Sequence, residues 1–185
     1  MLNLLNLSRL IDRLNAAVGH SVAWLVLAAV LISAGNAVVR KLLNTSSNAF
    51  LEIQWYLFAA VFLLAAGDTL RRRAHVRIDV LSARLSRRAQ AWIDIFGVLC
   101  FLLPLVVMVI WLSWPTVARA HATGEMSSNA GGLIRWPVLA LLPLGFALLG
   151  LQGLSELIKR VAWLRGLIAD PAPPEDQTVP GKDTR

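Results

Sequence analysis

The sequence predicts an all-α integral membrane protein with four transmembrane helices, an N-terminal amphipathic helix at the membrane interface, and both termini on the cytoplasmic side. Hydrophobic residues make up 57% of the 185 residues and charged residues only 16%, whereas a soluble domain carries about a quarter charged residues. Four apolar runs each reach the roughly 20 residues that a helix needs to cross a hydrocarbon core. The runs lack period-2 alternation, which favours helices over barrel strands. This composition excludes a soluble domain.

The first 20 residues have the pattern of an amphipathic helix on the cytoplasmic membrane surface. Apolar side chains recur there at helical spacing, at Leu4, Leu7, Ile11, Leu14 and Val18. Polar side chains point elsewhere, at Asn6, Arg9, Asp12 and Arg13. The alternative is a secretory signal peptide cleaved near residues 33–35, but the apolar stretch is longer than the roughly 7 to 15 residues usual for such a peptide.

The rest of the chain divides into spans and connections. The predicted spans cover residues 21–39, 50–70, 91–114 and 137–158. The predicted connections are an Arg-rich cytoplasmic loop at 71–90, a periplasmic loop at 115–136, and a cytoplasmic, partly disordered tail at 159–185. The tail is rich in proline and charge, a composition that cannot bury a core.

The distribution of basic residues sets the predicted orientation, because Lys and Arg accumulate in short cytoplasmic loops. The formal charge is +7, and an N-in, C-in topology places 14 of the 18 basic residues on the cytoplasmic side. Seven arginines of the cytoplasmic loop are candidates for anchoring to phospholipid headgroups: Arg71, Arg72, Arg73, Arg77, Arg84, Arg87 and Arg88. Ordinary topology determination is the alternative role for them. We expect no nucleic-acid partner, because these charges are tied to the bilayer surface.

The spans lack the residues that catalysis or ion coupling would need at membrane depth. Residues 55–66, 95–111 and 138–151 contain no charged side chain, Cys100 is the single cysteine, and the three histidines lie at or outside the predicted span ends. We therefore predict no catalytic residue, cofactor or metal site, and a function through contact. Four glycines allow close helix approach, within the protein or against a partner: Gly97, Gly145, Gly150 and Gly153.

Several short motifs resemble the small membrane subunit of tripartite ATP-independent periplasmic (TRAP) transporters, the DctQ-like family. They are Glu52 with Trp55, Ala-Gly-Asp-Thr-Leu at 66–70, Ala-His-Val-Arg-Ile-Asp-Val-Leu at 74–81, Gly-Glu-Met-Ser-Ser-Asn-Ala-Gly-Gly-Leu at 124–133, Trp-Pro at 136–137, and Leu-Gln-Gly-Leu-Ser-Glu at 151–156. The later motifs look most similar to the mannitol/chloroaromatic branch. The resemblance covers roughly residues 13–160.

The resemblance implies a non-enzymatic scaffold subunit in a bacterial inner membrane. Its implied partners are a large permease subunit, which carries the substrate and sodium sites and moves as an elevator, and a periplasmic binding protein that delivers a solute, usually a carboxylate. Candidate partner contacts are Glu52, Trp55, His75, Asp79, Arg119, Glu125 and Arg135. The alternatives are a self-sufficient small oligomeric transporter and an anchor subunit of an unrelated membrane complex.

Overall fold

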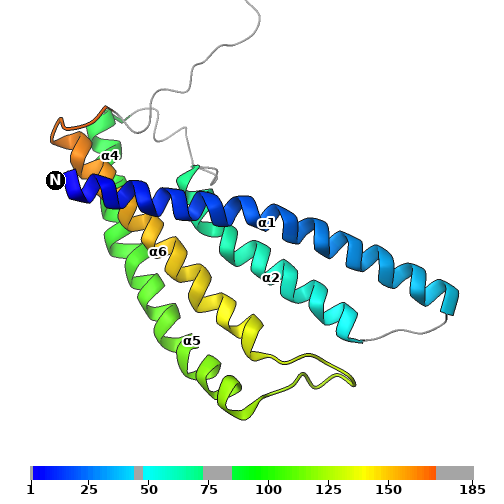
Figure 1. Ribbon diagram of the computed structural model, residues 1–185. Helices are drawn as coiled ribbons and strands as arrows, with labels where there is room; N and C mark the ends of the chain where they lie inside the picture. Colours follow the sequence, from blue (N-terminus) through cyan, green and yellow to red (C-terminus); the bar gives the residue numbers. More distant parts are fainter. Residues whose placement is uncertain (1, 44–47, 73–84, 170–185) are drawn as a thin grey trace, which may run out of the picture.

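The structure, a computed structural model, describes residues 2–43, 48–72 and 85–169, and over these ranges it is built from long helices (Figure 1). The elements are α1 (Leu2–Leu43), α2 (Asn48–Arg71), α4 (Arg87–Gly97), the π-helical segment η1 (Val98–Leu102), α5 (Leu103–Thr123) and α6 (Trp136–Leu164). In the described part of the chain, four helical stretches are long and apolar enough to cross a membrane, at Asn3–Leu42, Asn48–Arg71, Arg87–Thr123 and Trp136–Leu164. The predicted fold class is confirmed.

The helices form an open arrangement instead of a closed bundle. α2 packs against α1 and α6, α6 packs against α2 and α5, and α1 also contacts α6 directly. The N-terminus of α1, α4 and the end of α6 lie together at one end of the molecule, and the connection between α5 and α6 lies at the other (Figure 1). The first end carries the basic residues that predict the cytoplasmic side, so we call the two ends the inner and outer ends.

The first helix is longer than the predicted span. The predicted surface helix at 1–20 and the predicted span at 21–39 are one continuous helix, Leu2–Leu43, of 42 residues. No proline interrupts it, and residues of its first half pack against α6, so nothing ends the helix near residue 20. The surface location of residues 1–20 stays a prediction.

The helical stretch that contains the third predicted span is also longer than that span, because helical structure continues from Arg87 through Thr123. The π-helical segment Val98–Leu102 ends two residues before Pro104 and includes the residue four positions before this proline. A proline ring clashes with the carbonyl four residues earlier, and a wider π turn relieves such a clash. Pro115 lies inside α5, so the connection between α5 and α6 begins after Thr123 and not at residue 115; its periplasmic location stays a prediction.

The buried apolar core is thin and made mostly of small side chains. Its members in the described residues are Ile11, Val22, Ala29, Ala60, Ala91, Ile95, Val106, Ala120 and Ala162. Large apolar side chains lie on the outside, as they do where lipid or another membrane protein replaces water. The fold therefore exposes two broad apolar faces between its polar ends.

Candidate functional site

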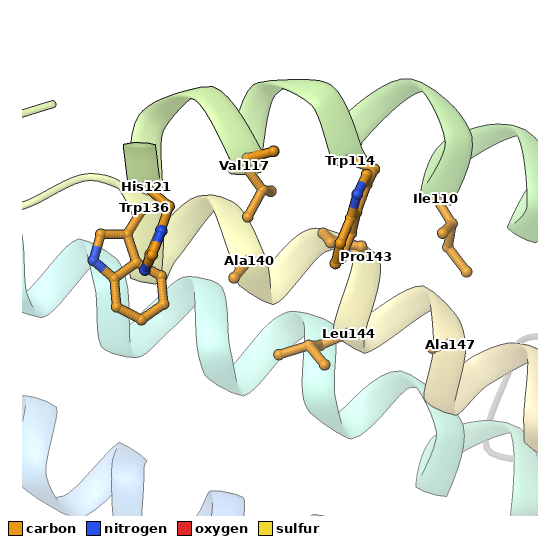
Figure 2. Close-up of a pocket in the computed structure, with 10 residues that line it drawn as sticks. Ile110, Trp114, Val117, His121, Trp136, Ala140, Pro143, Leu144 and Ala147 are labelled. Carbon is orange, nitrogen blue, oxygen red and sulfur yellow. The ribbon is translucent and has the colours of Figure 1, made fainter. Parts of the chain in front are cut away.

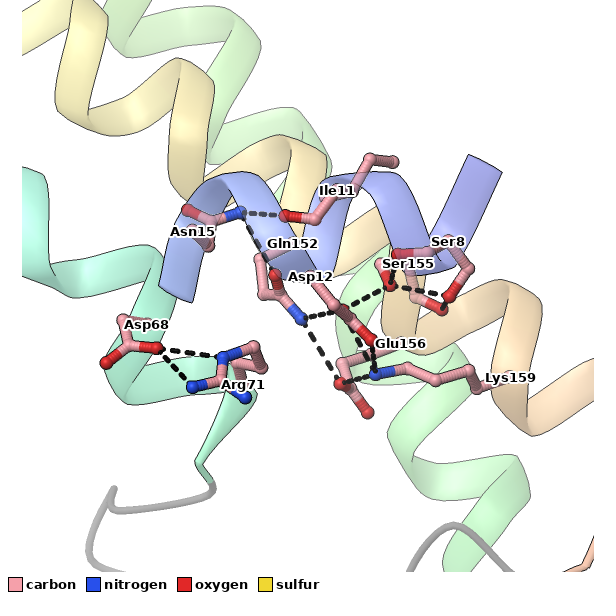
Figure 3. A network of polar contacts seen from close by, with 10 residues as sticks. All are labelled: Ser8, Ile11, Asp12, Asn15, Asp68, Arg71, Gln152, Ser155, Glu156 and Lys159. Atoms are coloured by element: carbon pink, nitrogen blue, oxygen red, sulfur yellow. Dashed lines mark hydrogen bonds and ion pairs between the residues drawn. The ribbon is translucent and has the colours of Figure 1, made fainter. Parts of the chain in front are cut away.

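A cluster of polar side chains joins α1 to α6 at the inner end (Figure 3). The Asp12 carboxylate on α1 accepts hydrogen bonds from Gln152 Nε2 and Ser155 Oγ, both at 2.8 Å, and pairs with Lys159 Nζ at 3.1 Å. Lys159 also pairs with Glu156 on its own helix. Next to them, the hydroxyls of Ser8 and Ser155 lie 2.8 Å apart. We call these residues, with Asn15, the inner clamp.

The inner clamp is a buried network rather than a surface patch. Ser8, Asn15, Gln152 and Ser155 are the largest fully buried side chains in the described residues. Asn15 Nδ2 donates a hydrogen bond to Gln152 Oε1 at 3.0 Å, and Gln152 Nε2 donates hydrogen bonds to the carboxylates of Asp12 and Glu156. Hydrogen bonds between membrane helices hold them in one register, because the groups have no water to bind instead.

Two glycines let α1 and α2 approach closely beside the clamp. A Cβ added at Gly67 of α2 would overlap the Asn15 amide, and a Cβ added at Gly19 of α1 would lie 2.5 Å from Asp68 Oδ2. Asn15 Oδ1 has no hydrogen-bond partner, and it is the atom that an added Cβ at Gly67 would overlap most closely. Each helix therefore offers a glycine to the polar side chain of the other, and both crossing points require a residue without a side chain.

The remaining inner-end carboxylates are also paired. The Asp68 side chain, in a residue that is 7% exposed, forms two ion pairs. Its carboxylate oxygens lie 2.7 Å from a guanidinium nitrogen of Arg71 and 2.7 Å from one of Arg72. Asp94 of α4 lies 2.5 Å from the nearly buried Arg160 of α6. Within the described ranges, each acidic side chain of this end, at positions 12, 68, 94 and 156, has at least one basic partner. Asp12 and Asp94 pair across helix contacts, whereas Asp68 and Glu156 pair with basic residues three or four positions along the chain.

A second cluster fixes the outer connection onto α2. Glu52 Oε1 accepts hydrogen bonds from Ser127 Oγ and from Asn129 Nδ2, the latter at 2.6 Å, and Glu52 Oε2 accepts from the backbone N–H of Leu133 at 2.7 Å. Asn48 and Tyr56 donate to backbone carbonyls of the same connection, at 3.1 and 3.3 Å. We call residues 124–134 the outer loop.

The outer loop is also closed on itself. Met126 and Ile134 form an antiparallel bridge, and the Arg135 guanidinium pairs with the Glu125 carboxylate. Gly124 ends α5 with φ of 61°, in the left-handed region that glycine adopts without strain. The loop is therefore held in a defined shape with the side chains of Met126 and Ile134 exposed.

The structure separates the predicted contact residues into three groups. Glu52, Glu125 and Arg135 come together to shape the outer loop, although Glu52 lies on another helix. Trp55, 76% exposed, and Arg119 point to the outside. The third group, His75 and Asp79, lies outside the described residues. The predicted anchors Arg73, Arg77 and Arg84 lie outside them as well.

The predicted arginine anchors have different surroundings. Arg71 and Arg72 both pair with Asp68, while Arg87 and Arg88 are exposed in the first turn of α4. That helix begins at Ser86, whose hydroxyl accepts a hydrogen bond from the Ala89 N–H. The anchoring itself stays a prediction.

The structure shows which of the four predicted packing glycines contact other helices of the chain. An added Cβ at Gly145 would lie 2.7 Å from the Leu63 carbonyl of α2, and one at Gly150 would lie 2.8 Å from Val106 of α5. An added Cβ at Gly153 would lie 2.6 Å from the Leu102 side chain, whereas one at Gly97 would have no neighbour within 4 Å. Three of the four glycines therefore serve packing within the chain.

The outward faces of the spans carry aromatic and large aliphatic side chains. On α2, Trp55, Phe58 and Phe62 share one face and are 76%, 57% and 80% exposed. On η1 and α5, Phe101, Met108 and Leu112 form a similar stripe. The described residues contain no group of three or more His, Cys, Asp or Glu side chains that could hold a metal ion. These features define a multi-pass membrane protein whose outward chemistry is apolar contact.

Comparison with known families then places this protein. The model of the family described as tripartite ATP-independent periplasmic transporters, DctQ component, matches residues 29–162. The match covers well over half of the chain, so the protein belongs to this family of transporter components. Neither the curated proteins nor the solved structures give a significant match.

Proposed function

We propose that this chain is the small membrane subunit of a TRAP transporter and acts as a scaffold for the large permease subunit. Its place in the complex is the bacterial inner membrane, and it supports sodium-coupled, binding-protein-dependent uptake of a solute that is usually a carboxylate. The observation that carries the scaffold role is the use of its polar groups. The inner clamp and the Glu52 contacts join elements of the chain to one another, which leaves the spans with apolar outer faces.

A scaffold must resist a moving neighbour, and the polar clusters supply that resistance. Buried hydrogen-bonded networks rigidify the elements they join, and the inner clamp joins α1 to α6 while Asp94 and Arg160 join α4 to α6. The arginines at the inner end, including Arg87 and Arg88, would bind phospholipid headgroups of the cytoplasmic leaflet. Such contacts contribute about 1 kcal/mol for each basic residue near an anionic surface.

We further propose that the large subunit packs on the aromatic stripe of α2. Aromatic side chains are enriched among the residues that dominate binding at interfaces, and Trp55, Phe58 and Phe62 are exposed along one helical face. The motifs around Trp55 and at 124–156 resemble the mannitol/chloroaromatic branch, which supports assigning the chain to that branch.

The experiment is co-purification and uptake with the large permease subunit of the same transporter. Changing Trp55, Phe58 and Phe62 together to alanine should abolish co-purification, and the matched triple change of Phe101, Met108 and Leu112 on α5 should preserve it. Loss of the complex in the α5 variant alone would place the interface on the other face. Solute uptake by this chain alone in proteoliposomes would contradict the scaffold function and favour a self-sufficient oligomeric transporter.

The outer loop is the proposed contact for the periplasmic binding protein. Glu52, Glu125 and Arg135 hold the loop in shape, and exposed Arg119 lies a turn before its start. A binding protein that docks transiently needs a preformed surface, because ordering a loop on binding costs free energy. Binding-protein-dependent uptake in loop variants tests this contact.

A further inference from the structure

α5 and α6 enclose a groove of about 630 Å³ in the outer half of the protein. Its α5 wall runs from Ile110 to His121 and its α6 wall from Trp136 to Ala147 (Figure 2). The two ring systems of His121 and Trp136 meet at its outer end, with centroids 5.1 Å apart. We call this space the outer groove.

The inner limit of the outer groove is set by close helix contact. One turn beyond Ala147, Gly150 of α6 lies directly against Val106 of α5. Between this contact and the His121–Trp136 pair, α6 presents Ala140, Pro143 and Ala147 to the groove. These three side chains are small and leave space between the helices, while Leu144 of the same helix also lines the groove.

The length of the groove matches one leaflet of a bilayer. Each wall spans eleven residue steps, Ile110 to His121 and Trp136 to Ala147, which at the rise of an α-helix is about 16 Å. Half of a hydrocarbon core is about 15 Å. Because α5 ends and α6 begins at the outer loop, the groove extends from the outer interface toward the bilayer centre.

The distribution of polar atoms along the groove is that of an acyl-chain site with a headgroup end. The His121 imidazole and the Trp136 indole N–H lie at the interface end, where aromatic side chains with a polar group are favoured. The deeper lining is apolar, with aliphatic side chains at Ile110, Leu144 and Ala147 and the Trp114 ring on α5. Two donors at the headgroup level suit the phosphate and ester oxygens of a lipid, and the aliphatic part suits its chain.

The inner limit of the groove favours a lipid chain over a helix of a partner. The groove closes where Gly150 of α6 meets Val106 of α5, so an occupant that enters from the outer interface ends near the bilayer centre, whereas a membrane-spanning helix continues through both leaflets. We propose that the outer groove is a binding site for a glycerophospholipid of the outer leaflet. One acyl chain lies between α5 and α6, and the phosphate lies at His121 and Trp136. This site does not depend on the proposed scaffold function.

The experiment uses the full-length chain, alone and assembled with its large subunit, in bilayers that contain phosphatidylethanolamine with a photoreactive diazirine in one acyl chain. After illumination, peptides covering 110–121 and 136–147 should carry several-fold more label than the exposed apolar segment 24–31 of α1. A diacylglycerol probe with the same chains lacks the phosphate and should label the groove less.

Filling the groove should remove the excess label. Ala140→Trp and, separately, Ala147→Phe should each reduce groove labelling to the level of α1. Val107→Trp, a control on the exposed face of α5 outside the groove, should leave it unchanged. His121→Ala removes a hydrogen-bond donor without filling the groove. It should reduce the difference in groove labelling between the phosphatidylethanolamine probe and the diacylglycerol probe.

Three results would overturn the inference. The first is groove labelling no higher than that of α1, and the second is labelling that persists in both filled variants. The third is the loss of groove labelling when the large subunit binds, because it would show that a helix of that partner occupies the groove.

Discussion

Gln152 is the side chain on which the inner clamp depends most, and its replacement by leucine gives the sharpest test of the fold. Gln152 is fully buried and bonds to Asn15 at 3.0 Å and to Asp12 at 2.8 Å, both across the α1–α6 contact. Leucine has a similar size but cannot bond to either. Gln152→Leu therefore leaves a buried amide and part of a carboxylate without partners.

The magnitude follows from the two bonds. Hydrogen bonds between membrane helices contribute about 0.6 kcal/mol on average and about 1.7 at most, and bonds to charged groups lie at the upper end of the usual range. We expect Gln152→Leu to destabilise the α1–α6 contact by about 2 kcal/mol, which changes the folded-to-unfolded ratio by up to about 30-fold. The measurement is equilibrium unfolding of the purified protein in mixed micelles with increasing denaturing detergent.

The double variant tests the cause. Replacing both members of a buried pair by apolar groups costs much less than replacing one, because no polar group is left unpaired. Asn15→Leu with Gln152→Leu should therefore recover part of the stability lost in Gln152→Leu. Gln54→Leu on α2 makes the same chemical change outside the clamp and should cost less than about 0.5 kcal/mol. Strictly additive effects of the Asn15 and Gln152 changes would refute the proposed pairing.

Three further predictions concern other parts of the molecule. Glu52→Ala removes the acceptor of three loop donors, so amide hydrogen exchange at residues 127–133 should become faster. Unchanged protection of these amides would contradict the role of Glu52 in holding the outer loop on α2. Gly67→Leu should separate α1 from α2 by steric overlap, costing about 1–3 kcal/mol or more. A disulfide between cysteines placed on the two helices should then form more slowly, whereas Gly97→Leu, facing open space, should not slow it. Arg119→Glu should reduce binding-protein-dependent uptake if the outer loop region is the docking surface, and normal uptake would remove that proposal.

The spans could be predicted from the sequence because hydrophobic length alone determines them. The inner clamp could not, although its signal is present. Polar residues recur at one helical spacing in α1, at Ser8, Asp12 and Asn15, and again in α6, at Gln152, Glu156 and Lys159. Each set marks a polar stripe, but only the crossing of the two helices shows that the stripes bind each other.

Ile11 illustrates the same limit. The predicted apolar stripe groups it with Leu7 and Leu14, yet Ile11 is buried beside the clamp while the two leucines are 47% and 45% exposed. A helix that contacts protein on one side and lipid on another has two apolar directions, which a single periodicity does not separate. Glu52 was singled out by motif, but its loop partners lie 75 to 81 residues away, a distance that no local pattern spans.

The length of α1 has a consequence for how the protein occupies the bilayer plane. Arg13 and Arg40 lie near opposite ends of its apolar stretch, and the 27 residue steps between them span about 40 Å of helix. If both guanidiniums reach headgroup level across a core of about 30 Å, the helix tilts by about 40° and its ends are offset sideways by about 26 Å. A helix perpendicular to the membrane can rotate about the membrane normal without displacing lipid. A tilted helix must displace lipid when it rotates about the same axis. In that placement, the slanted α1 would give this small chain a large rotational drag for its mass.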